Sequence, residues 1–237
     1  MQNNHIKLLC TRPLNDVIIE QSLQNGIEIS VISFIKTETI ISEVLTKNIR
    51  SLATKEITAI FTSMNAVNAV TKHLQAIPDW DIYSLSGTTK DLVIDFFGEN
   101  KLIKTARSAK DLSHRIIENE SKFPVVFFTG NLRLDTLPNH LTQHNITFEE
   151  LVVYNTTLTP TRVQQDFDSI LFFSPSAVVS FFSNNKISDT IVLFAIGDTT
   201  ADTIKTYTKN KIIISNSPAK ESMVEQVIDY FKPINQS

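Results

Sequence analysis

The sequence predicts an α/β protein made of two similar open parallel-sheet α/β/α domains that are joined by a two-segment linker, with one domain discontinuous. Short apolar runs alternate with helical patterns along the chain, which is typical of parallel sheets with helices on both faces. The chain repeats itself once, and its 237 residues, 42% of them hydrophobic, suffice for two domains of about 100–120 residues each.

The internal repeat is the strongest of these observations. Three segments return in the same order, each displaced by 110 to 112 residues: 61–67 as 173–178, 86–91 as 197–202, and 109–112 as 219–222. A fainter fourth match pairs residues 10–14 with 128–132. Because the order and the displacement agree, one structural unit is present twice.

The predicted strands are apolar runs rich in Ile, Val and Phe and bounded by turn residues. They cover residues 6–11, 27–35, 57–62, 81–85, 101–104, 123–128, 146–154, 168–173, 190–196 and 211–214. The continuous runs 123–128 and 190–196 suit strands that are covered on both faces. The alternating runs 27–35 and 146–154 suit sheet edges or exposed ribbons.

Helices are predicted where apolar residues recur at helical spacing. The first contains Leu14, Val17, Ile18 and Gln21, begins at Pro13 and ends at Gly26. A second contains Ile41, Val44, Leu45, Ile49 and Leu52, and the last contains Met223, Val224, Val227, Ile228 and Phe231.

The repeat also predicts the domain boundaries. The second copy has no segment behind it to match 128–132, and residues 8–14 supply the missing piece. We therefore expect residues 1–36 and 160–237 to form a discontinuous domain, and residues 37–156 to form the inserted one. The linkers lie near 36–38 and 155–160. Two open α/β units that face each other would form a cleft, where small ligands bind.

Composition excludes several classes of function. The formal charge of −3 argues against a nucleic-acid-binding face, which needs clustered Lys and Arg. Cys10 is the only cysteine, so no internal disulfide or cysteine-rich metal site exists. The longest apolar stretch, near 170–182, is broken by Ser and Pro and is shorter than the ~20 residues that span a bilayer. We expect a cytoplasmic protein with no membrane partner.

Hydroxyl-bearing residues and scarce glycines follow the predicted strands. They are Thr11-Arg12, Thr62-Ser63, Thr129-Gly130, Ser174-Pro175-Ser176 and Gly197-Asp198-Thr199-Thr200. Ligands of open α/β sheets bind beyond the carboxyl ends of the strands, where helix N-termini present unpaired N–H groups. Each hydroxyl taken alone is explained by helix capping, but together they predict sites for carboxylates or phosphates. No Walker loop or G-x-G-x-x-G fingerprint supports nucleotide binding.

In combination these motifs resemble the uroporphyrinogen-III synthase family. The resemblance rests on Thr11-Arg12-Pro13, Phe61-Thr62-Ser63, Phe128-Thr129-Gly130-Asn131-Leu132, Val152-Val153-Tyr154, Phe172-Phe173-Ser174-Pro175-Ser176, Ile196-Gly197-Asp198-Thr199-Thr200 and Ser217-Pro218-Ala219-Lys220-Glu221. It implies an enzyme that acts without cofactor or metal. The enzyme cyclises linear hydroxymethylbilane with loss of water and inverts ring D through a spiro intermediate. We expect it to act as a monomer.

The resemblance also implies the site residues. Tyr154 matches the tyrosine beside the family's cleft and is expected to protonate or orient the leaving hydroxyl; the alternative is a linker tyrosine packed against the ribbon. Substrate binding is expected from Arg12, Ser63, Gly130, Ser174, Ser176, Gly197, Thr199 and Thr200. Arg12 could equally form a surface ion pair, and Arg133 and Lys220 are weaker candidates of the same kind. Asp198 places an anion at a turn expected to face an anionic ligand.

Other residues and other classes of protein fit the sequence less well. His140 and His144 stand four residues apart, but no third metal ligand is near, so a solvated pair is favoured. Cys10, inside a strand, is expected in the core. A non-catalytic two-lobed binding protein for an anionic ligand would share the predicted features except the need for Tyr154. A tandem pair of receiver-like modules would need an acidic pocket, and the strand ends carry Thr and Ser instead.

Overall fold

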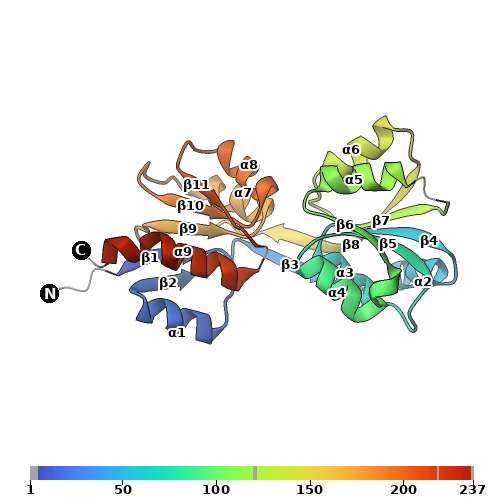
Figure 1. Ribbon diagram of the computed structural model, residues 1–237, viewed down its shortest axis with the longest axis horizontal. Helices are drawn as coiled ribbons and strands as arrows, with labels where there is room; N and C mark the ends of the chain where they lie inside the picture. The colour runs from blue at the N-terminus through green and yellow to red at the C-terminus, as the bar shows by residue number, and fades with distance from the viewer. Residues whose placement is uncertain (1–4, 120–121, 218, 236–237) are drawn as a thin grey trace. The chain divides into compact units, whose positions relative to one another are not determined.

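The computed structural model describes residues 5–119, 122–217 and 219–235. Contacts divide the chain into two compact units: unit 1 comprises Met1–Lys36 and Thr157–Ser237, and unit 2 comprises Thr37–Thr156. Each unit is an α/β structure with its own parallel sheet (Figure 1). The predicted fold class, two α/β units of which one is discontinuous, is confirmed.

The sheet of unit 1 has the strand order β11-β10-β9-β1-β2. Its elements are β1 (Ile6–Cys10), α1 (Asp16–Gln24), β2 (Ile27–Val31), β9 (Ser169–Phe172), α7 (Pro175–Asn184), β10 (Val192–Ala195), α8 (Asp198–Lys205), β11 (Ile212–Ile214) and α9 (Lys220–Asn235). Helices α7 and α8 cover one face of the sheet, and α1 and α9 cover the other (Figure 1). Two buried clusters fill the two interfaces, as a three-layer α/β/α unit requires.

The sheet of unit 2 has the order β3-β8-β7-β4-β5-β6. Its elements are α2 (Glu43–Ala53), β4 (Ile57–Phe61), α3 (Met64–Thr71), β5 (Trp80–Leu85), α4 (Thr88–Phe97), the 3₁₀ turn Glu99–Lys101, β6 (Leu102–Ala106), α5 (Ala109–Glu118), β7 (Val125–Gly130) and α6 (Thr136–Gln143). Helices α2, α3 and α4 cover one face, and α5 and α6 cover the other.

The strand orders explain the repeat in the sequence. Reading unit 1 as β11-β10-β9-β1-β2 and unit 2 as β6-β5-β4-β7-β8 gives the same arrangement, in which β9 corresponds to β4 and β1 corresponds to β7. The fainter sequence match between residues 10–14 and 128–132 therefore joins the ends of two equivalent strands.

The chain passes between the units in two strands. These are β3 (Ile35–Thr39) and β8 (Phe148–Leu158), which are neighbours in the sheet order. The repeat predicted linkers near 36–38 and 155–160, where the chain crosses between the domains, but both crossings lie within or at the end of these strands. A strand that has water on one side tolerates polar residues at alternate positions, and β3 alternates between half-buried and exposed side chains.

Three further expectations were wrong in detail. The predicted strand 27–35 divides into β2 and the start of β3. Phe34 lies between them, fully buried against Phe181, with ring centroids 5.2 Å apart. Helix α1 begins after Asn15 rather than at Pro13, because the Asn15 side chain accepts a hydrogen bond from the Ile18 amide at 2.9 Å.

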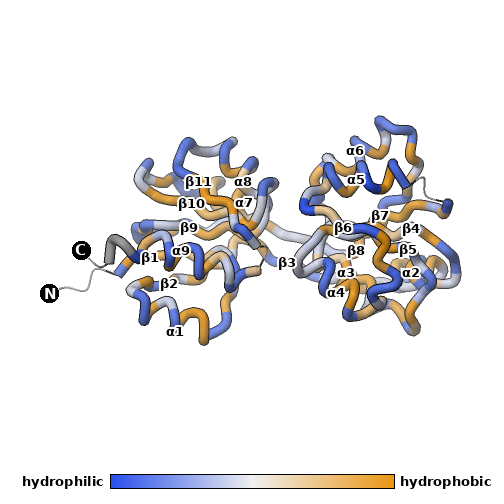
Figure 2. The backbone as a smooth tube through the Cα atoms, viewed as in Figure 1, coloured by the Kyte–Doolittle hydropathy of each residue, from blue (hydrophilic) through white to orange (hydrophobic). Residues whose placement is uncertain are grey.

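Helix α2 begins after Ser42, which caps it, and this leaves part of its predicted apolar face in solvent. Ile41 precedes the helix and is 82% exposed, and Val44 is 70% exposed, while Leu45 and Ile49 are buried. The predicted two-sided burial of β7 and β10 is confirmed. Figure 2 shows the helices changing colour between hydrophobic and hydrophilic along their length, as amphipathic helices covering a sheet do.

Candidate active site

The carboxyl end of the central strands of unit 2 gathers three of the predicted site residues. Ser63 follows β4, Gly130 ends β7, and Tyr154 lies in β8. These strands are parallel neighbours in the order β8-β7-β4, so their carboxyl ends lie at one edge of the sheet. That edge is where ligands of open α/β sheets bind.

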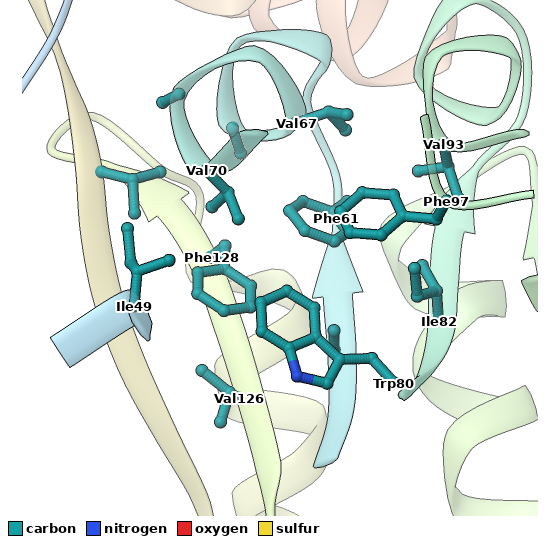
Figure 3. Packing of buried hydrophobic residues seen from close by; sticks show 14 of the residues in the cluster. Ile49, Phe61, Val67, Val70, Trp80, Ile82, Val93, Phe97, Val126 and Phe128 are labelled. Atoms are coloured by element: carbon teal, nitrogen blue, oxygen red, sulfur yellow. The ribbon is translucent and has the colours of Figure 1, made fainter. Parts of the chain in front are cut away.

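The strands that lead to this edge are held by a buried aromatic cluster (Figure 3). Phe61 of β4 and Phe128 of β7 stack with ring centroids 5.2 Å apart, and Trp80 lies on Phe128 at 5.4 Å. The indole N–H of Trp80 donates a hydrogen bond to the Leu52 carbonyl at 3.1 Å. Ser63 and Gly130 each lie two residues beyond a stacked phenylalanine, so their backbone positions are set by the core.

The pairing of β7 with β8 is interrupted beside Tyr154. Thr129 pairs with Val152, but Gly130 pairs with Tyr154, so Val153 is one extra residue in β8. Both Val153 and Tyr154 then pack against the same hydrophobic cluster, although successive residues of a regular strand point to opposite faces. The bulge therefore places the Tyr154 side chain on the face of the sheet that α3 covers.

Gly130 is in contact with the ring of Tyr154. A Cβ atom added at Gly130 would lie 2.4 Å from both Cε2 and Cζ of Tyr154 and 2.9 Å from its hydroxyl oxygen. These distances exclude any side chain at position 130 unless the tyrosine moves. The Tyr154 ring therefore lies directly on the backbone at Gly130.

The phenol of Tyr154 is in an environment that keeps it protonated. Burial raises its pKa above the ordinary value, and a hydrogen bond with the Ser63 side chain acts in the opposite direction. Ser63 also caps α3, because its hydroxyl oxygen accepts a hydrogen bond from the Asn65 amide at 3.1 Å. A hydrogen bond that the Ser63 hydroxyl donates to the phenolic oxygen stabilises the phenolate, which agrees with the direction of this effect on the pKa.

The equivalent edge of unit 1 carries cations in place of a tyrosine. Arg12 is half-buried after β1, next to Thr11, whose hydroxyl donates to the Leu171 carbonyl at 2.8 Å. The Lys220 ammonium donates to the Pro13 carbonyl at 3.0 Å. Burial first, and then the nearby Arg12 guanidinium, lower the pKa of Lys220. Two neighbouring cations at a strand end are suited to binding carboxylates.

The remaining predicted residues lie at two helix starts of unit 1. Ser174 caps α7 by accepting from the Ala177 amide at 3.2 Å, and its hydroxyl is 3.5 Å from that of Ser176. Gly197 precedes α8 and has no atom within 4 Å of an added Cβ. Thr199 is exposed and lies inside α8, whose N-cap residue is Gly197, so it does not cap the helix as the alternative interpretation held; Thr200 is buried. Asp198, the first residue of α8, is exposed.

Arg133 has partners that make it a poor carboxylate site. Its guanidinium donates to both Glu150 oxygens, one of them at 2.9 Å, and it also forms an ion pair with Asp135. The two acidic side chains neutralise it. Cys10 is fully buried in β1, as expected, and burial raises its pKa to about 11.

Three histidines lie together: His114 on α5, His140 on α6 and His144 directly after α6. The ring of His140 is 4.7 Å from that of His114 and 5.4 Å from that of His144. Within residues 5–119, 122–217 and 219–235, no group of three His, Cys, Asp or Glu side chains has a geometry that could hold a metal ion. In the same part of the chain, no helix has the length and apolar character needed to cross a membrane.

Asn131, which lies next to this site, was not among the expected residues. It follows Gly130 directly, and its side chain is hydrogen-bonded to the backbone of Thr156 in β8. An amide side chain next to a glycine at the end of a buried strand is a signal that could have indicated it, because Asn side chains commonly bond to nearby backbone. Of the motif 217–221, Pro218 lies outside the described residues.

Comparisons with known proteins identify the fold and the family of the chain. The fold is similar to a mutant uroporphyrinogen III synthase from the extremely thermophilic bacterium Thermus thermophilus, with a TM-score of 0.71 at 12% identity, over 98% of this chain and 100% of that one. It is also similar to uroporphyrinogen-III synthetase from Helicobacter pylori, with a TM-score of 0.59 at 16% identity, over 95% and 99% of the two chains. A second crystal form of the Thermus enzyme, wild type, gives 0.56 at 12% identity over 98% of both chains.

No curated protein sequence matches the chain. At these identities the solved structures show the fold, and the family has to come from the sequence itself. The sequence model described as HEM4, uroporphyrinogen-III synthase HemD, matches residues 16–225. That match covers all of unit 2 and most of unit 1, and the chain therefore belongs to the uroporphyrinogen-III synthase family.

Proposed function

We propose that Tyr154 is the proton donor of the reaction that this chain performs on hydroxymethylbilane. The family makes the chain an enzyme of tetrapyrrole biosynthesis, a lyase that cyclises its substrate to uroporphyrinogen III. One observation carries the assignment of Tyr154. Its phenol lies at the carboxyl end of three parallel strands, is kept protonated by burial, and is hydrogen-bonded to Ser63.

The chemistry requires a proton at the start of the reaction. The C–O bond of the hydroxymethyl group breaks, and the departing oxygen takes the phenol proton and leaves as water. The electron pair of a pyrrole nitrogen stabilises the resulting azafulvene cation. The Ser63 hydroxyl donates a hydrogen bond to the tyrosinate that is formed and lowers its energy at this step.

The substituted carbon of ring D then attacks the cation and gives the spiro intermediate, which fragments and recloses as the type III isomer. The proton that ring D finally loses restores the Tyr154 phenol, so water is the only by-product. The uncatalysed ring closure gives the symmetrical type I isomer. The protein must therefore hold the substrate in one conformation in addition to assisting the loss of water.

The substrate carries acetate and propionate groups on every ring, and we assign their binding to the edge of unit 1. Arg12 supplies a permanent cation there. Hydroxyl and amide donors come from Ser174, Ser176, Gly197, Thr199 and the backbone of Thr200, at the starts of α7 and α8. Helix N-termini favour anions, so an acidic chain can bind a polyanion without a broad basic surface.

This proposal includes a monomeric enzyme of the cytoplasm. Its two domains would be residues 1–36 with 160–237, and residues 37–156. The contact-defined units support these boundaries to within a few residues of the second crossing. The single, buried cysteine supports a reducing compartment, because the chain has no thiol available for a disulfide.

The test of function is a product analysis. Hydroxymethylbilane is generated in situ, the purified chain is added, and the isomers are resolved chromatographically after oxidation to porphyrins. We expect type III product at a rate above the spontaneous cyclisation. Type I product alone, at the spontaneous rate, would contradict the proposal and would favour a non-catalytic binding protein for an anionic ligand.

A further inference from the structure

Asn131 forms an unusual set of hydrogen bonds with the strand that carries Tyr154. Its backbone amide donates to the Tyr154 carbonyl at 3.3 Å. Its side-chain oxygen accepts from the Thr156 amide at 2.7 Å, and its side-chain nitrogen donates to the Thr156 carbonyl at 3.2 Å. Three bonds from one residue thus reach the backbone on either side of Asn155.

These bonds replace the sheet pairing that β8 loses at this point. Strand β7 ends at Gly130, whereas β8 continues to Leu158. A further residue of β7 would have offered β8 a backbone donor and a backbone acceptor. The amide of Asn131 offers the same two groups from its side chain, so the backbone of Thr156, which is buried, has both of its polar groups satisfied.

The hydrogen bonds of Asn131 hold the register of β8 at the bulge next to Tyr154. Because Val153 is inserted in β8, the strand could shift by one residue and restore regular pairing with β7. That shift would move the Tyr154 ring to the opposite face of the sheet, away from Gly130 and Ser63. Bonds on both sides of the bulge hold the register in which the ring lies over Gly130.

We propose that Asn131 is a positioning residue for Tyr154: it fixes the bulge of β8 through Thr156 and so holds the phenol in its place over Gly130. The inference rests on the proposed function, in which Tyr154 donates a proton to the leaving hydroxyl. It adds a residue that acts on the reaction through the backbone of β8, without contact with the substrate.

The competing interpretation is that Asn131, which is exposed, binds a substrate carboxylate through its amide. The two interpretations differ in their effect on kinetics. Loss of a substrate contact raises KM, whereas a misplaced proton donor lowers kcat. A displacement of about 1 Å at a reacting group can cost about 10²-fold in rate.

The decisive experiment is a double-mutant cycle of Asn131→Ala and Tyr154→Phe, assayed with hydroxymethylbilane generated in situ. We expect Asn131→Ala to lower kcat by about 10- to 100-fold with little change in KM. In the Tyr154→Phe background it should have no further effect, because the group that it positions is gone. Equal losses of kcat in both backgrounds, or a raised KM with kcat unchanged, would overturn the proposal.

Asn185→Ala is the matched control. The Asn185 side chain also bridges backbone groups: it accepts from the Val163 amide and donates to the Thr161 and Phe181 carbonyls, each at 2.8 Å. It lies in unit 1 and far along the chain from Tyr154, so its loss should affect stability alone. Asn131→Asp keeps the acceptor for the Thr156 amide and provides a variant that folds if the alanine variant does not. An intermediate loss of kcat is expected from it, and unchanged kcat would count against the proposal.

A spectroscopic readout separates this inference from the assignment of Tyr154 as proton donor. The four tyrosines are replaced by fluorotyrosine, and the ¹⁹F signal of residue 154 is identified by its loss in Tyr154→Phe. Asn131→Ala should shift or broaden that signal, and Asn185→Ala should leave it unchanged. If Tyr154→Phe is fully active, the proton-donor assignment fails while the shift still supports the positioning role. If the ¹⁹F signal of residue 154 does not change in Asn131→Ala, the positioning role is overturned, whatever the activity of that variant.

Discussion

The two units share the same order of five strands, but the equivalent strand ends carry different side chains. In unit 1, β1 and β2 pair in regular register up to Cys10 and Val31; Arg12 follows β1, and Lys220, the first residue of α9, lies beside it. In unit 2, the corresponding strands β7 and β8 contain a bulge, a glycine under the ring of Tyr154, and a side-chain amide that completes the pairing. A duplicated framework thus carries cations at the edge of one sheet and, at the edge of the other, a buried phenol that we propose as the proton donor.

The first test of this comparison adds one methyl group at the carboxyl ends of the strands in each unit. Gly130→Ala places a Cβ 2.4 Å from the Tyr154 ring, so overpacking should lower the free energy of unfolding by about 1–3 kcal/mol. Gly197→Ala meets no atom within 4 Å in an extended backbone that any residue adopts, so stability should stay the same or rise slightly. Urea denaturation measures both. Equal changes in the two variants would show that the Tyr154 ring does not lie against Gly130.

The second test removes the cations of unit 1. Arg12→Ala and Lys220→Ala should each weaken substrate binding by about tenfold at low salt and less at high salt, because solvent ions screen exposed charges. The KM for hydroxymethylbilane at two ionic strengths measures the effect. A loss of kcat with unchanged KM would assign these cations to the reaction step and would remove the distinction between the two edges.

The third test concerns the bond between Ser63 and Tyr154. This bond lowers the phenol pKa, so Ser63→Ala should raise the pKa of Tyr154 and make the phenol a weaker acid. Ultraviolet titration of tyrosinate, with Tyr154→Phe subtracted, measures the change. Ser42→Ala is the control, since Ser42 caps α2 through an equal bond of 3.1 Å to the Leu45 amide. A similar change in both variants would mean that capping, not the bond to Tyr154, is responsible.

The last of these tests concerns Cys10, at the end of β1. Burial raises its thiol pKa to about 11, so almost no thiolate is present near pH 8. Its reaction with a thiol reagent should be more than about tenfold slower in the native chain than in denaturant. Rapid labelling of the native chain would show that the edge of unit 1 is open around β1, contrary to its regular pairing.

The sequence predicted the framework well because the repeat and the apolar runs depend on local pattern. Most predicted strands lie within two residues of their observed bounds, and Ser63 and Ser174 cap helices as their positions suggested. Strand β3 was missed because Lys36 and Glu38 gave no apolar run. Its stability comes from pairing with β8, which is distant in the sequence.

The arrangement around Tyr154 could be predicted only in part. The resemblance to the family indicated the tyrosine. The scarcity of glycine in the chain indicated that Gly130 is needed for a tight turn or a close contact. The bulge in β8 left no mark in the hydrophobic pattern, because Val152, Val153 and Tyr154 all suit a strand. Its position depends on the side chain of Asn131, twenty-five residues before Thr156, and such a contact follows from the fold and not from local sequence.

The most direct test of the account compares Tyr154→Phe with Tyr207→Phe. Tyr207 is half exposed in unit 1 and stacks on Phe182 with ring centroids 5.0 Å apart, so it controls for the loss of one hydroxyl. With hydroxymethylbilane in single-turnover experiments, Tyr154→Phe should form type III product at least about 10²-fold more slowly, with substrate binding little changed. Tyr207→Phe should match the unaltered chain. An undiminished rate in Tyr154→Phe, or an equal loss of rate and of binding, would contradict the claim that Tyr154 supplies the proton.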